Sequence, residues 1–379
     1  MYKVSYATGS RADYGIVRKY LHLMESDSEI DLSILVTGTH LEREYGNTKE
    51  LIDEDGYRIS LEVPLKLSEN PIVTTSVAKT IYEFGNYFSE IKPDLLIVLG
   101  DRYEMFGVTI AAALNKIKIL HIHGGESTFG NYDEFIRHSM TKMSMYHIVS
   151  TEKYRQRVIQ LGESPNRVFN LGALGAENCK YIDLNNVEKS ILELQNKKYF
   201  VILFHPETLT QISIEDQIKT LLKAIEQFGN YLFVFVGSNA DTGSYTIRET
   251  IKKYVGGNIN SIYFENVNPD SYHFLVKNAK CLIGNSSSGI IEAPSLGTYT
   301  INIGDRQKGR EKGNSVIDVR CIASEIVNAI KTVEKIDNSS YETIINNPYE
   351  TCDTANLYLK KTKDILKRRD TLSKEFWDL

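Results

Sequence analysis

Residues 95–126 read LLIVLGDRYEMFGVTIAAALNKIKILHIHGGE, two apolar runs separated by a segment with the composition of a helix. This pattern predicts a strand over Leu95–Leu99, a helix over Glu104–Asn115 and a second strand over Ile117–His123. Parallel strands joined by a helix end at the same edge of a sheet, where open α/β folds bind ligands. Asp101 and Glu126 follow the two runs. We therefore expect both carboxylates to face one crevice, as they would in an enzyme.

The alternation of strand and helix patterns continues through most of the chain and restarts after a polar stretch that ends near residue 198. Further strands are predicted at residues 3–7, 32–37, 147–150, 168–171, 199–204, 231–236, 261–264, 281–283 and 299–303. In the clearest helix, one apolar face is formed by Val77, Ile81, Phe84, Phe88 and Ile91. Near-continuous apolar strands that alternate with helices predict parallel sheets covered on both faces. We expect domains at residues 1–180 and 181–353, followed by a basic amphipathic helix over Thr354–Arg369.

The composition excludes several classes of protein. The 379 residues are 42% hydrophobic, enough for a sizeable core, and their net charge is −5 with both signs mixed. This argues against a nucleic-acid partner, which needs a basic face. The first residues lack the apolar segment of a signal peptide, and no run approaches the roughly 20 apolar residues of a membrane helix. The cysteines lie far apart without a CxxC pair, at Cys179, Cys281, Cys321 and Cys352, so we expect a cytoplasmic protein with reduced thiols.

Two glycine-rich turns are candidate anion sites. The first, Gly9–Gly15 (GSRADYG), follows a strand, and Arg11 adds a planar guanidinium suited to phosphate or uracil oxygens. It does not match the dinucleotide pattern GxGxxG, so a plain strand–helix connection is an equally good interpretation. The second, Gly284–Gly289 (GNSSSG), has three hydroxyls where one serine would suffice as a helix cap, which favours phosphate contact. Ile290-Ile291 follow where Lys-Ser/Thr would stand, which excludes a Walker A nucleotide hydrolase.

Charged residues near the second turn extend the phosphate hypothesis. Glu292 would accept hydrogen bonds from ribose hydroxyls, or would only balance a helix dipole. The loop Gly304–Arg310 (GDRQKGR) follows a strand and carries three cations, which suit a diphosphate or face solvent. His205 ends a predicted strand, where its imidazole would stabilise a departing diphosphate or only complete a turn. The residues alone leave these alternatives open.

Two histidines and a third acid stand near the acid pair. His121 and His123 are two residues apart, so we expect both to point to one face of their strand. With Glu126 they could hold a metal, but buried strand histidines are more often hydrogen-bonded core or site-lining groups, and we expect no metal. Glu134 lies in the first turn of a helix that we expect to begin one residue earlier. It could converge with the other acids, and Arg137 follows on the same helix face.

These motifs, taken together, resemble the UDP-N-acetylglucosamine 2-epimerase family. The resemblance covers residues 1 to about 320 in the right order. It rests on GSRADY (9–14), LGDR (99–102), HIHGGE (121–126), DEFIRH (133–138), FHPET (204–208), GNSSSG (284–289) and GDRQKGR (304–310). His-Gly-Gly-Glu at 123–126 points to the hydrolysing branch, which makes N-acetylmannosamine for bacterial sialic acid synthesis. Gly15 departs from some relatives, which carry a hydroxyl at this position.

The resemblance implies an α/β protein of the GT-B fold, with two Rossmann-like domains and an interdomain active-site cleft. A final helix, within residues 354–379, would cross back to the first domain. The resemblance also implies no cofactor, no metal, and a homodimer or homotetramer. It assigns catalysis to Asp101, Glu126, Glu134 and His205. It assigns substrate binding to Arg11, His40, Arg102, Arg137, Ser286, Ser287, Glu292 and Arg306.

The implied reaction converts UDP-N-acetylglucosamine and water into N-acetylmannosamine and UDP, by elimination to a glycal followed by hydration. Within the family, a UDP-2,4-diacetamido sugar of legionaminic acid synthesis or a GDP-linked sugar is an alternative substrate. Outside this chemistry, a GT-B glycosyltransferase or a non-catalytic nucleotide-sugar sensor would share the fold. The expected partner is a nucleotide sugar, and neither a nucleic acid nor a membrane is expected.

Overall fold

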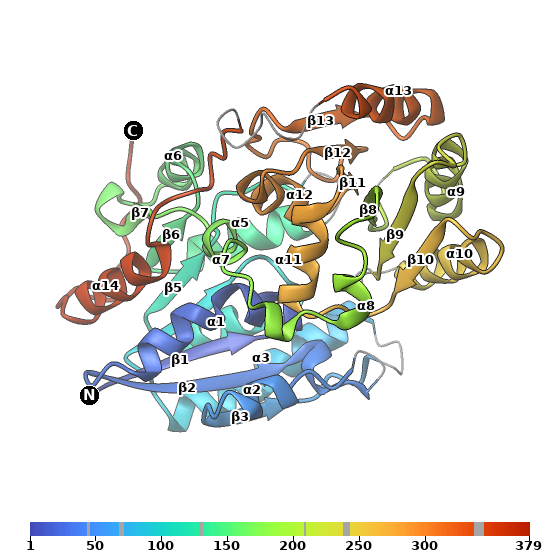
Figure 1. Cartoon of the computed structure of the whole chain (residues 1–379). Helices are drawn as coiled ribbons and strands as arrows, with labels where there is room; N and C mark the ends of the chain where they lie inside the picture. The colour runs from blue at the N-terminus through green and yellow to red at the C-terminus, as the bar shows by residue number, and fades with distance from the viewer. Residues whose placement is uncertain (44–45, 68–71, 129–131, 208–209, 238–242, 337–344) are drawn as a thin grey trace. The chain divides into compact units, whose positions relative to one another are not determined.

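The computed structural model describes the chain except for residues 44–45, 68–71, 129–131, 208–209, 238–242 and 337–344 (Figure 1). Thr208, the last residue of one motif, therefore lies outside the described residues. The chain forms two compact units. Unit 1 comprises residues 1–126, 132–174 and 351–379, and unit 2 comprises residues 127–131 and 175–350. The units change a few residues before the boundaries at 180/181 and 353/354 that we expect from the sequence.

Unit 1 is built on a parallel sheet of seven strands in the order β3-β2-β1-β4-β5-β6-β7. The strands are β1 (Tyr2–Thr8), β2 (Ile30–Thr37), β3 (Ile59–Val63), β4 (Leu95–Leu99), β5 (Ile119–Ile122), β6 (Tyr146–Val149) and β7 (Val168–Asn170). After β3 the chain continues on the other side of β1, so the strand order reverses between β1 and β4. Open α/β sheets bind ligands at the carboxyl ends of the strands where this reversal occurs. Gly9 follows β1 and Asp101 follows β4, so both turns lie at this point.

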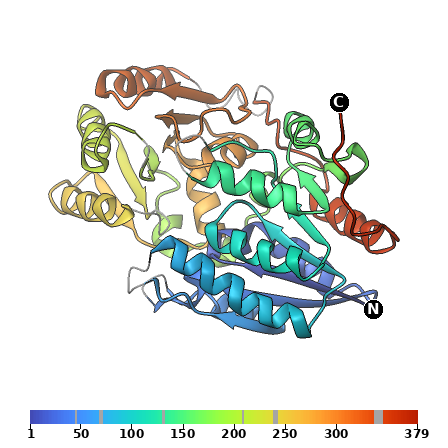
Figure 2. The ribbon, with the colours of Figure 1, turned by 180° about the vertical axis from the view of Figure 1, so that it is seen from behind.

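Helices cover both faces of the sheet of unit 1 (Figure 1). They are α1 (Arg11–Glu25), α2 (Glu50–Glu54), α3 (Val73–Glu90), α4 (Tyr103–Leu114), α5 (Asp133–Met143), α6 (Glu152–Gln160) and α14 (Thr354–Leu366). One core packs α1 and α14 against the strands through Tyr20, Leu120 and Tyr358. The opposite core packs α3, α4 and α5 through residues such as Phe84 and Met140, and Figure 2 shows these helices in front of the sheet.

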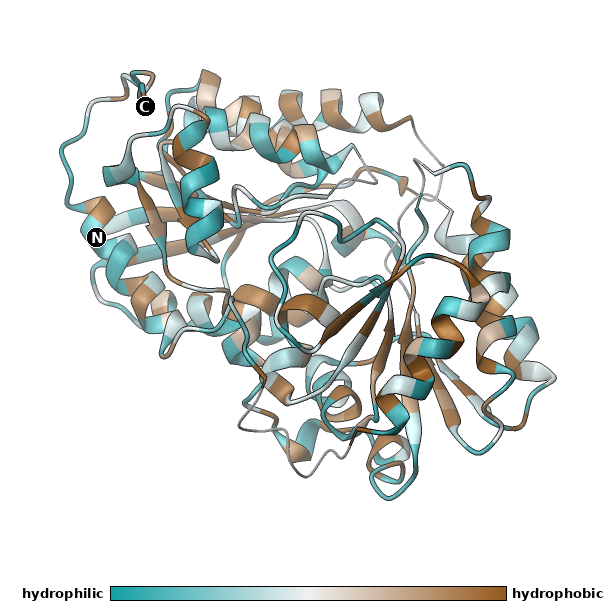
Figure 3. Ribbon diagram, turned by 90° about the horizontal axis from the view of Figure 1, so that it is seen from above, coloured by the Kyte–Doolittle hydropathy of each residue, from teal (hydrophilic) through white to brown (hydrophobic). Residues whose placement is uncertain are grey.

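Unit 2 repeats this plan with six parallel strands in the order β10-β9-β8-β11-β12-β13. The strands are β8 (Tyr199–Leu203), β9 (Leu232–Val236), β10 (Ser261–Phe264), β11 (Leu282–Gly284), β12 (Thr300–Ile303) and β13 (Val316–Val319). The helices are α7 (Leu174–Asn178), at the change between the units, α8 (Lys189–Leu192), α9 (Ile214–Ile225), α10 (Ser244–Gly256), α11 (Pro269–Asn278), α12 (Ser288–Ile291) and α13 (Ala323–Glu334). Figure 3 shows the apolar strands in brown between helices that carry polar residues on one side. In this sheet the order reverses between β8 and β11.

The predicted class of two parallel α/β domains is confirmed, although two strands were not predicted. Both of them, β3 (ISLEV) and β13 (VIDV), lie at the edge of a sheet and contain an acidic residue. An edge strand has one neighbour and stays partly exposed, so it lacks the continuous apolar run of a central strand. This is why the alternation of apolar runs did not reveal them.

The apolar face predicted for α3 is only partly buried. Phe84 is buried, but Ile91 follows the end of the helix and is exposed. The buried stripe continues instead through Ser76 and Thr80. A Cβ atom on Gly107 of α4 would lie 2.8 Å from Cβ of Thr80, so α3 and α4 approach closely and only small side chains fit between them.

The basic helix predicted over Thr354–Arg369 is α14, which ends at Leu366 and belongs to unit 1. The ring of Tyr358 packs edge-on against Tyr20 of α1, with 5.6 Å between ring centroids. The hydroxyl of Tyr358 donates a hydrogen bond of 2.8 Å to Gly172 O. Neither α14 nor any other helix among the described residues is long and apolar enough to cross a membrane.

Candidate functional site

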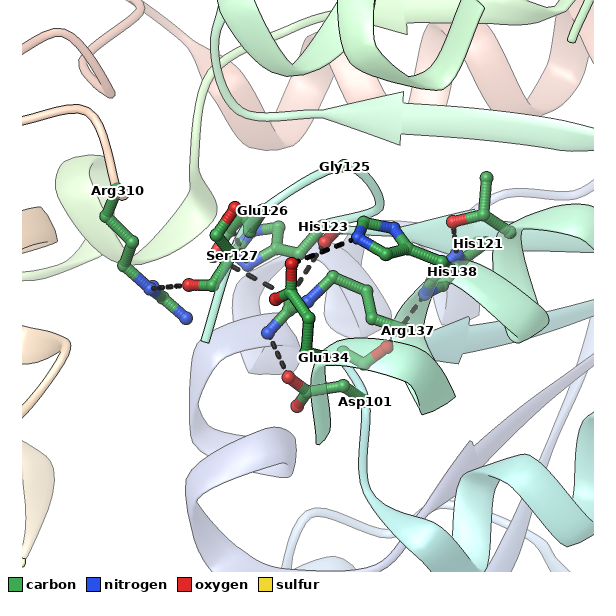
Figure 4. A network of polar contacts seen from close by, with 12 residues as sticks. Asp101, His121, His123, Gly125, Glu126, Ser127, Glu134, Arg137, His138 and Arg310 are labelled. Carbon is green, nitrogen blue, oxygen red and sulfur yellow. Dashed lines mark hydrogen bonds and ion pairs between the residues drawn. The ribbon is translucent and has the colours of Figure 1, made fainter. Parts of the chain in front are cut away.

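A buried arginine joins the two acids that follow β4 and β5. These strands are neighbours in the sheet, so their carboxyl ends lie side by side. Arg137 of α5, whose side chain is 3% exposed, forms an ion pair with Asp101 through Nη2 and Oδ2. Its Nη1 lies 3.7 Å from Glu126 Oε2 and donates a hydrogen bond of 3.0 Å to His123 O. The structure thus brings Asp101 and Glu126 together around one guanidinium (Figure 4).

Glu126 is enclosed, whereas Asp101 is partly open: their side chains are 1% and 18% exposed. Glu126 Oε1 accepts a hydrogen bond of 2.9 Å from Ser150 Oγ, and His123 Nδ1 lies 3.5 Å from the same oxygen. Burial disfavours an ionised carboxylate, whereas hydrogen-bond donors and a nearby cation favour it. The site therefore offers two carboxylates that share one cation but differ in their exposure to solvent, as groups for general acid–base chemistry.

The prediction that His121 and His123 point to one face of their strand is wrong. β5 ends at Ile122, and His123 adopts a left-handed backbone conformation with φ of 64°, so the alternation of the strand stops before it. His121 Nε2 lies 2.8 Å from Gly100 O, and its Nδ1 lies 3.1 Å from Thr141 Oγ1. Because a carbonyl only accepts, Nε2 carries the proton and Nδ1 accepts from the hydroxyl. Burial lowers the pKa of His121 to about 3, so a neutral ring braces the turn after β4.

Glu134 lies in the first turn of α5, which begins at Asp133 as predicted. Its Oε1 lies 3.2 Å from Nε2 of His138, one turn further along the helix. Glu134 is partly buried and stands three residues before Arg137, on the same side of the helix. Figure 4 shows it in one network of polar side chains with Asp101 and Arg137, so α5 brings a third carboxylate to the site.

A further group of charges lies where β1 and β4 end. Arg102 donates a hydrogen bond of 2.7 Å from Nε to Oε1 of Glu104, whose side chain is fully buried. Burial raises the pKa of Asp13, in the first turn of α1, to about 6, against the attraction of the Arg102 charge. Arg11 begins α1 directly after the N-cap Ser10, and burial lowers the pKa of its guanidinium. The first glycine turn therefore does open a helix, as the anion-site hypothesis requires.

His40 is buried, and both nitrogens of its ring contact other side chains. Nε2 lies 3.0 Å from Thr8 Oγ1 and Nδ1 lies 2.9 Å from Thr48 Oγ1. Burial lowers the pKa of His40 to about 4, so the ring is neutral near pH 7. Since Thr8 ends β1, His40 ties the turn after β2 to the end of β1. A direct contact between His40 and substrate stays a prediction.

In unit 2, Asn285 connects the ends of the strands on either side of the order reversal. Its Oδ1 accepts a hydrogen bond of 2.7 Å from His205 N, and its Nδ2 donates one of 2.9 Å to His205 O. The Asn285 carbonyl accepts from Arg306 Nη1 at 3.0 Å and from Gln307 Nε2 at 2.9 Å. Asn285 is fully buried. It therefore fixes His205, after β8, and Arg306, after β12, relative to each other.

The serine-rich turn opens a helix, as expected, but α12 (Ser288–Ile291) is only one turn long. Gly284 precedes it with φ of 149°, and a Cβ atom there would lie 1.9 Å from Leu203 O, so the close approach of β11 to β8 requires glycine. Ser286 and Ser287 are partly exposed, and Ser286 Oγ accepts from Ser288 N at 3.3 Å. Because a four-residue helix has a small dipole, hydroxyls and cations must supply most of any attraction for an anion here.

Glu292, directly after α12, is held by a cluster of side chains. Ser288 Oγ donates to Glu292 Oε2 and accepts a hydrogen bond of 2.8 Å from Tyr272 OH. His273 Nε2 lies 3.8 Å from the same carboxylate oxygen. Burial acts to raise the pKa of Glu292, but His273 and Ser288 together hold it below its usual value. The carboxylate is therefore ionised and able to accept hydrogen bonds.

The three cations of the loop Gly304–Arg310 have different surroundings. Besides its bond to Asn285, Arg306 donates from its backbone N–H to Glu207 Oε1 at 2.9 Å, and burial raises the pKa of Glu207. Lys308 is exposed and lies 3.5 Å from Asp305, which fits the solvated alternative. Arg310 Nε donates to Ser127 O at 3.2 Å (Figure 4). Arg306 is thus the cation of this loop that is bonded to the strand ends.

Several residues of these clusters were not predicted as site residues: Asp13, Glu104, Ser150, Tyr272, His273 and Asn285. Ser150 and Asn285 had a usable signal, because Ser150 ends one predicted strand and Asn285 stands two residues after another, both at the carboxyl edge of a sheet. Tyr272 and His273 lie on α11, where no sequence pattern marks them. Among the residues that the structure describes, no three His, Cys, Asp or Glu side chains are grouped as a metal site would require.

Comparison with known proteins places this geometry in context. The family model described as UDP-N-acetylglucosamine 2-epimerase matches residues 22–362. The polysialic acid biosynthesis protein P7 of Escherichia coli is 44% identical over 384 residues, which cover 100% of this chain and 98% of the relative. A GDP/UDP-N,N'-diacetylbacillosamine 2-epimerase (hydrolyzing) of Campylobacter jejuni is 36% identical over 346 residues, which cover 90% of this chain and 88% of the relative.

Solved structures share the fold. MnaA of S. aureus, in a co-structure with UDP, superposes with a TM-score of 0.82 at 17% identity, over 99% of this chain and 98% of that chain. The UDP-GlcNAc 2-epimerase from Neisseria meningitidis, bound to UDP-GlcNAc, gives a TM-score of 0.79 at 17% identity, over 96% of this chain and 100% of that chain. The predicted GT-B class, two Rossmann-like domains with parallel sheets, is confirmed.

Proposed function

Since the chain belongs to the UDP-N-acetylglucosamine 2-epimerase family, we propose that it is a hydrolysing 2-epimerase that converts UDP-N-acetylglucosamine and water into N-acetylmannosamine and UDP for sialic acid synthesis. The similar protein of Escherichia coli is named for polysialic acid biosynthesis, and that of Campylobacter jejuni is named a hydrolyzing 2-epimerase. The first name supports a role in sialic acid synthesis, and the second supports an enzyme of the hydrolysing branch.

One observation carries the proposal: carboxylates from two neighbouring strand ends share one buried guanidinium. Inversion at C2 of the sugar requires that an unactivated C–H bond be broken. A base takes the C2 proton while UDP leaves C1 with the bonding electrons, which gives a glycal. Water then adds its hydroxyl to C1, and a proton returns to the opposite face of C2. Enclosed Glu126 and partly open Asp101 supply two groups in different surroundings for these proton transfers.

Residues of unit 2 would bind the UDP part of the substrate. His205 and Arg306, which Asn285 holds together, would stabilise the departing diphosphate electrostatically. The other candidate ligands for UDP in this unit are Ser286, Ser287 and Glu292, the last of them suited to ribose hydroxyls.

In unit 1, Glu134 would orient or share the proton near C2. Arg11, at the first turn of α1, would contact phosphate or uracil oxygens. Arg102, His40 and Arg137 would also bind the substrate, and their own partners, Glu104, Thr8 and Asp101, would hold them in position.

Neutral isosteres of the two acids test the chemistry. Asp101→Asn and Glu126→Gln should each lower release of UDP and N-acetylmannosamine by roughly 10²- to 10⁴-fold, while UDP binding stays measurable by calorimetry. Lys308→Gln, at an exposed position of the unit 2 loop, is the control. In D₂O the wild-type product should carry deuterium at C2; retention of the substrate hydrogen, or wild-type turnover in either acid variant, would refute the proposal.

The choice of sugar needs its own experiment. The name of the Campylobacter jejuni relative favours, as a second candidate, the same reaction on a UDP-linked or GDP-linked 2,4-diacetamido sugar. Offering UDP-N-acetylglucosamine and its 4-acetamido analogue in parallel, with NMR of the released sugar, separates the two. Release of UDP only when a sugar acceptor is present would identify a glycosyltransferase instead, and binding without turnover would identify a sensor.

A further inference from the structure

The helix α5 carries three polar side chains of the candidate site. Glu134, Arg137 and His138 lie in its first half, and the helix ends at Met143. The backbone carbonyls of the last turn of a helix receive no hydrogen bond from N–H groups of that helix, so they need donors from elsewhere. Because Arg137 belongs to the same helix, a shift of the C-terminal end of α5 along the helix axis also shifts Arg137.

Lys374, from the segment after α14, meets this end of α5. Its Nζ donates hydrogen bonds of 2.8 Å to Lys142 O and 2.6 Å to Ser144 O. The first of these carbonyls belongs to the last turn of α5, and the second to its C-cap residue. A cation at a helix C-terminus also opposes the partial negative charge of the helix dipole. Lys374 therefore caps α5 in both respects.

A buried carboxylate holds the ammonium of Lys374 in place. Glu163, whose side chain is 1% exposed, lies 2.7 Å from Lys374 Nζ through Oε2 and 2.8 Å from Lys142 Nζ through Oε1. His147 Nε2 lies 3.1 Å from Oε2. Burial acts to raise the pKa of Glu163, but His147 and the two lysines hold it at about 2. The carboxylate thus stays ionised and clamps a lysine from each of the two segments.

The cluster around Glu163 is also connected to the candidate site through neighbouring strands of the sheet. His147 in β6 is the register partner of His121 in β5. His121 in turn donates to Gly100 O, in the residue before Asp101. The clamp is therefore connected both to α5 and to the turn that carries Asp101.

The segment around Lys374 is attached to unit 1 at further points. The backbone N–H of Trp377 donates to Gly162 O at 3.0 Å, and Lys142 Nζ lies 5.0 Å from the centre of the Phe376 ring. Tyr146 OH donates to Asp370 Oδ2 at 2.7 Å. These contacts hold a segment without helix or strand of its own against the end of α5.

We propose that Lys374 is a positioning residue for the epimerase reaction, because it caps the end of α5 and thereby holds Arg137 between Asp101 and Glu126. In its kinetic part this inference rests on the proposed function. Small displacements of groups that act on a substrate reduce the rate by large factors, so loosening the far end of α5 affects proton transfer without removing any group from the site.

Lys374→Met removes the N–H donors and the charge but keeps the length of the side chain. It should lower kcat on the order of 10-fold, while KM and the affinity for UDP stay within about twofold, because the residues proposed to bind UDP in unit 2 are unchanged. Lys374→Arg, which keeps charge and donors, should give a kcat closer to wild type than to Lys374→Met. The matched control is Lys367→Met at the end of α14, where Lys367 is 55% exposed and lies 3.4 Å from Glu29.

If Lys374 only stabilised the fold, kcat would not change at temperatures where the variants are fully folded. Assays at a temperature where circular dichroism shows every variant to be folded separate activity from stability. Addition of ethylammonium to Lys374→Ala should restore part of kcat, because the free amine can occupy the vacated position. Wild-type kcat in Lys374→Met, an equal loss in Lys367→Met, or no recovery with ethylammonium would each overturn the inference.

Hydrogen exchange without substrate tests the capping independently of activity. Amides of residues 140–147 should exchange faster in Lys374→Met than in wild type, and should be unchanged in Lys367→Met. Unchanged exchange in Lys374→Met would overturn the inference even if the enzyme is an epimerase. If wild-type protein releases no UDP from either sugar nucleotide, the proposed function fails, and exchange alone then decides whether Lys374 holds α5.

Discussion

At the scale of single residues, Arg137 has the largest expected effect, because two acids share its charge. Arg137→Met leaves Glu126, at 1% exposure, without its cation. Breaking a buried pair in this way costs roughly 3–5 kcal/mol of the free energy of unfolding. Loss of the positioned charge should also lower kcat on the order of 10²-fold. Urea unfolding and a UDP-release assay measure the two effects.

The double variant Arg137→Met/Glu126→Gln is the control for this stability effect. It removes both charges, so its free energy of unfolding should exceed that of Arg137→Met alone. If the double variant loses as much free energy of unfolding as Arg137→Met and Glu126→Gln lose together, Arg137 does not stabilise the carboxylate of Glu126, contrary to the arrangement in Figure 4.

The buried ring of His40 should make stability depend on pH. Its pKa is about 4 in the folded chain, below the ordinary value of 6.5, so the unfolded chain takes up the proton first as the pH falls. The free energy of unfolding is therefore highest above pH 6.5 and declines towards pH 4, by up to about 1.4 kcal/mol per pH unit from this residue. We expect this slope in the difference between the free energies of unfolding of wild type and His40→Asn, measured with urea between pH 7 and pH 4.5.

Taking the difference matters because Asp13, whose pKa is raised to about 6, acts in the opposite direction over part of this range. That contribution is common to both proteins and cancels. His22→Asn, at an exposed position of α1, is the control. A constant difference between wild type and His40→Asn at every pH would contradict the assignment of a neutral, buried ring to His40.

At the scale of elements, the interiors of central strands could be predicted and their ends could not. β4 occupies Leu95–Leu99 as predicted, because five apolar residues stand between Asp94 and Gly100. β5 was predicted to reach His123, whose positive φ ends it one residue earlier. A left-handed residue other than glycine leaves no mark in an apolar pattern, so hydrophobic periodicity does not show where such a strand ends.

The motifs predicted candidate site residues at the ends of neighbouring strands, but they did not predict the hydrogen bonds and ion pairs between their side chains. That Arg137 binds substrate stays a prediction; that it also lies between two acids depends on how α5 packs on the sheet. The bond between Lys374 and Lys142 joins residues 232 positions apart, and neither residue stands in a recognisable pattern. Such contacts follow from tertiary packing, which local composition does not encode.

Asn285 tests whether the bonds between strand ends matter for binding. In Asn285→Asp, a carboxylate oxygen replaces the donor to His205 O, so an attraction becomes a repulsion in a buried place. The affinity for UDP should fall on the order of 10-fold, measured by calorimetry. Asn260→Asp is the matched control, since Asn260 Nδ2 also donates to a carbonyl, Gly229 O, before β10 begins. Equal affinities of the two variants would show that Asn285 does not fix the binding residues.

At the scale of the whole molecule, the restart of the strand pattern near residue 199 correctly predicted two sheets. Each unit has its own cores on both faces of its sheet, and none of the residues that the structure describes belongs to the cores of both units. Unit 1 is completed by α14 and the segment after it, which come from the other end of the sequence. This closure depends on which surface α14 covers, and its amphipathic pattern alone does not specify that surface.

Because the cores are separate, a substitution in one unit should lower the stability of that unit and leave the unfolding transition of the other unchanged. Trp377 is the single tryptophan of the chain and belongs to unit 1, so its fluorescence reports on that unit. Tyr358→Ala removes a buried ring and its bond to Gly172 O, which should cost about 3–5 kcal/mol and lower the midpoint of the fluorescence transition in urea.

Tyr199→Ala is the matched variant in unit 2, where a buried tyrosine donates to Leu275 O. It should leave the fluorescence midpoint in place and shift only part of the far-ultraviolet circular dichroism. If both variants shift both signals equally, the two units unfold as one cooperative block, and a local loss in either sheet would then reach the whole molecule.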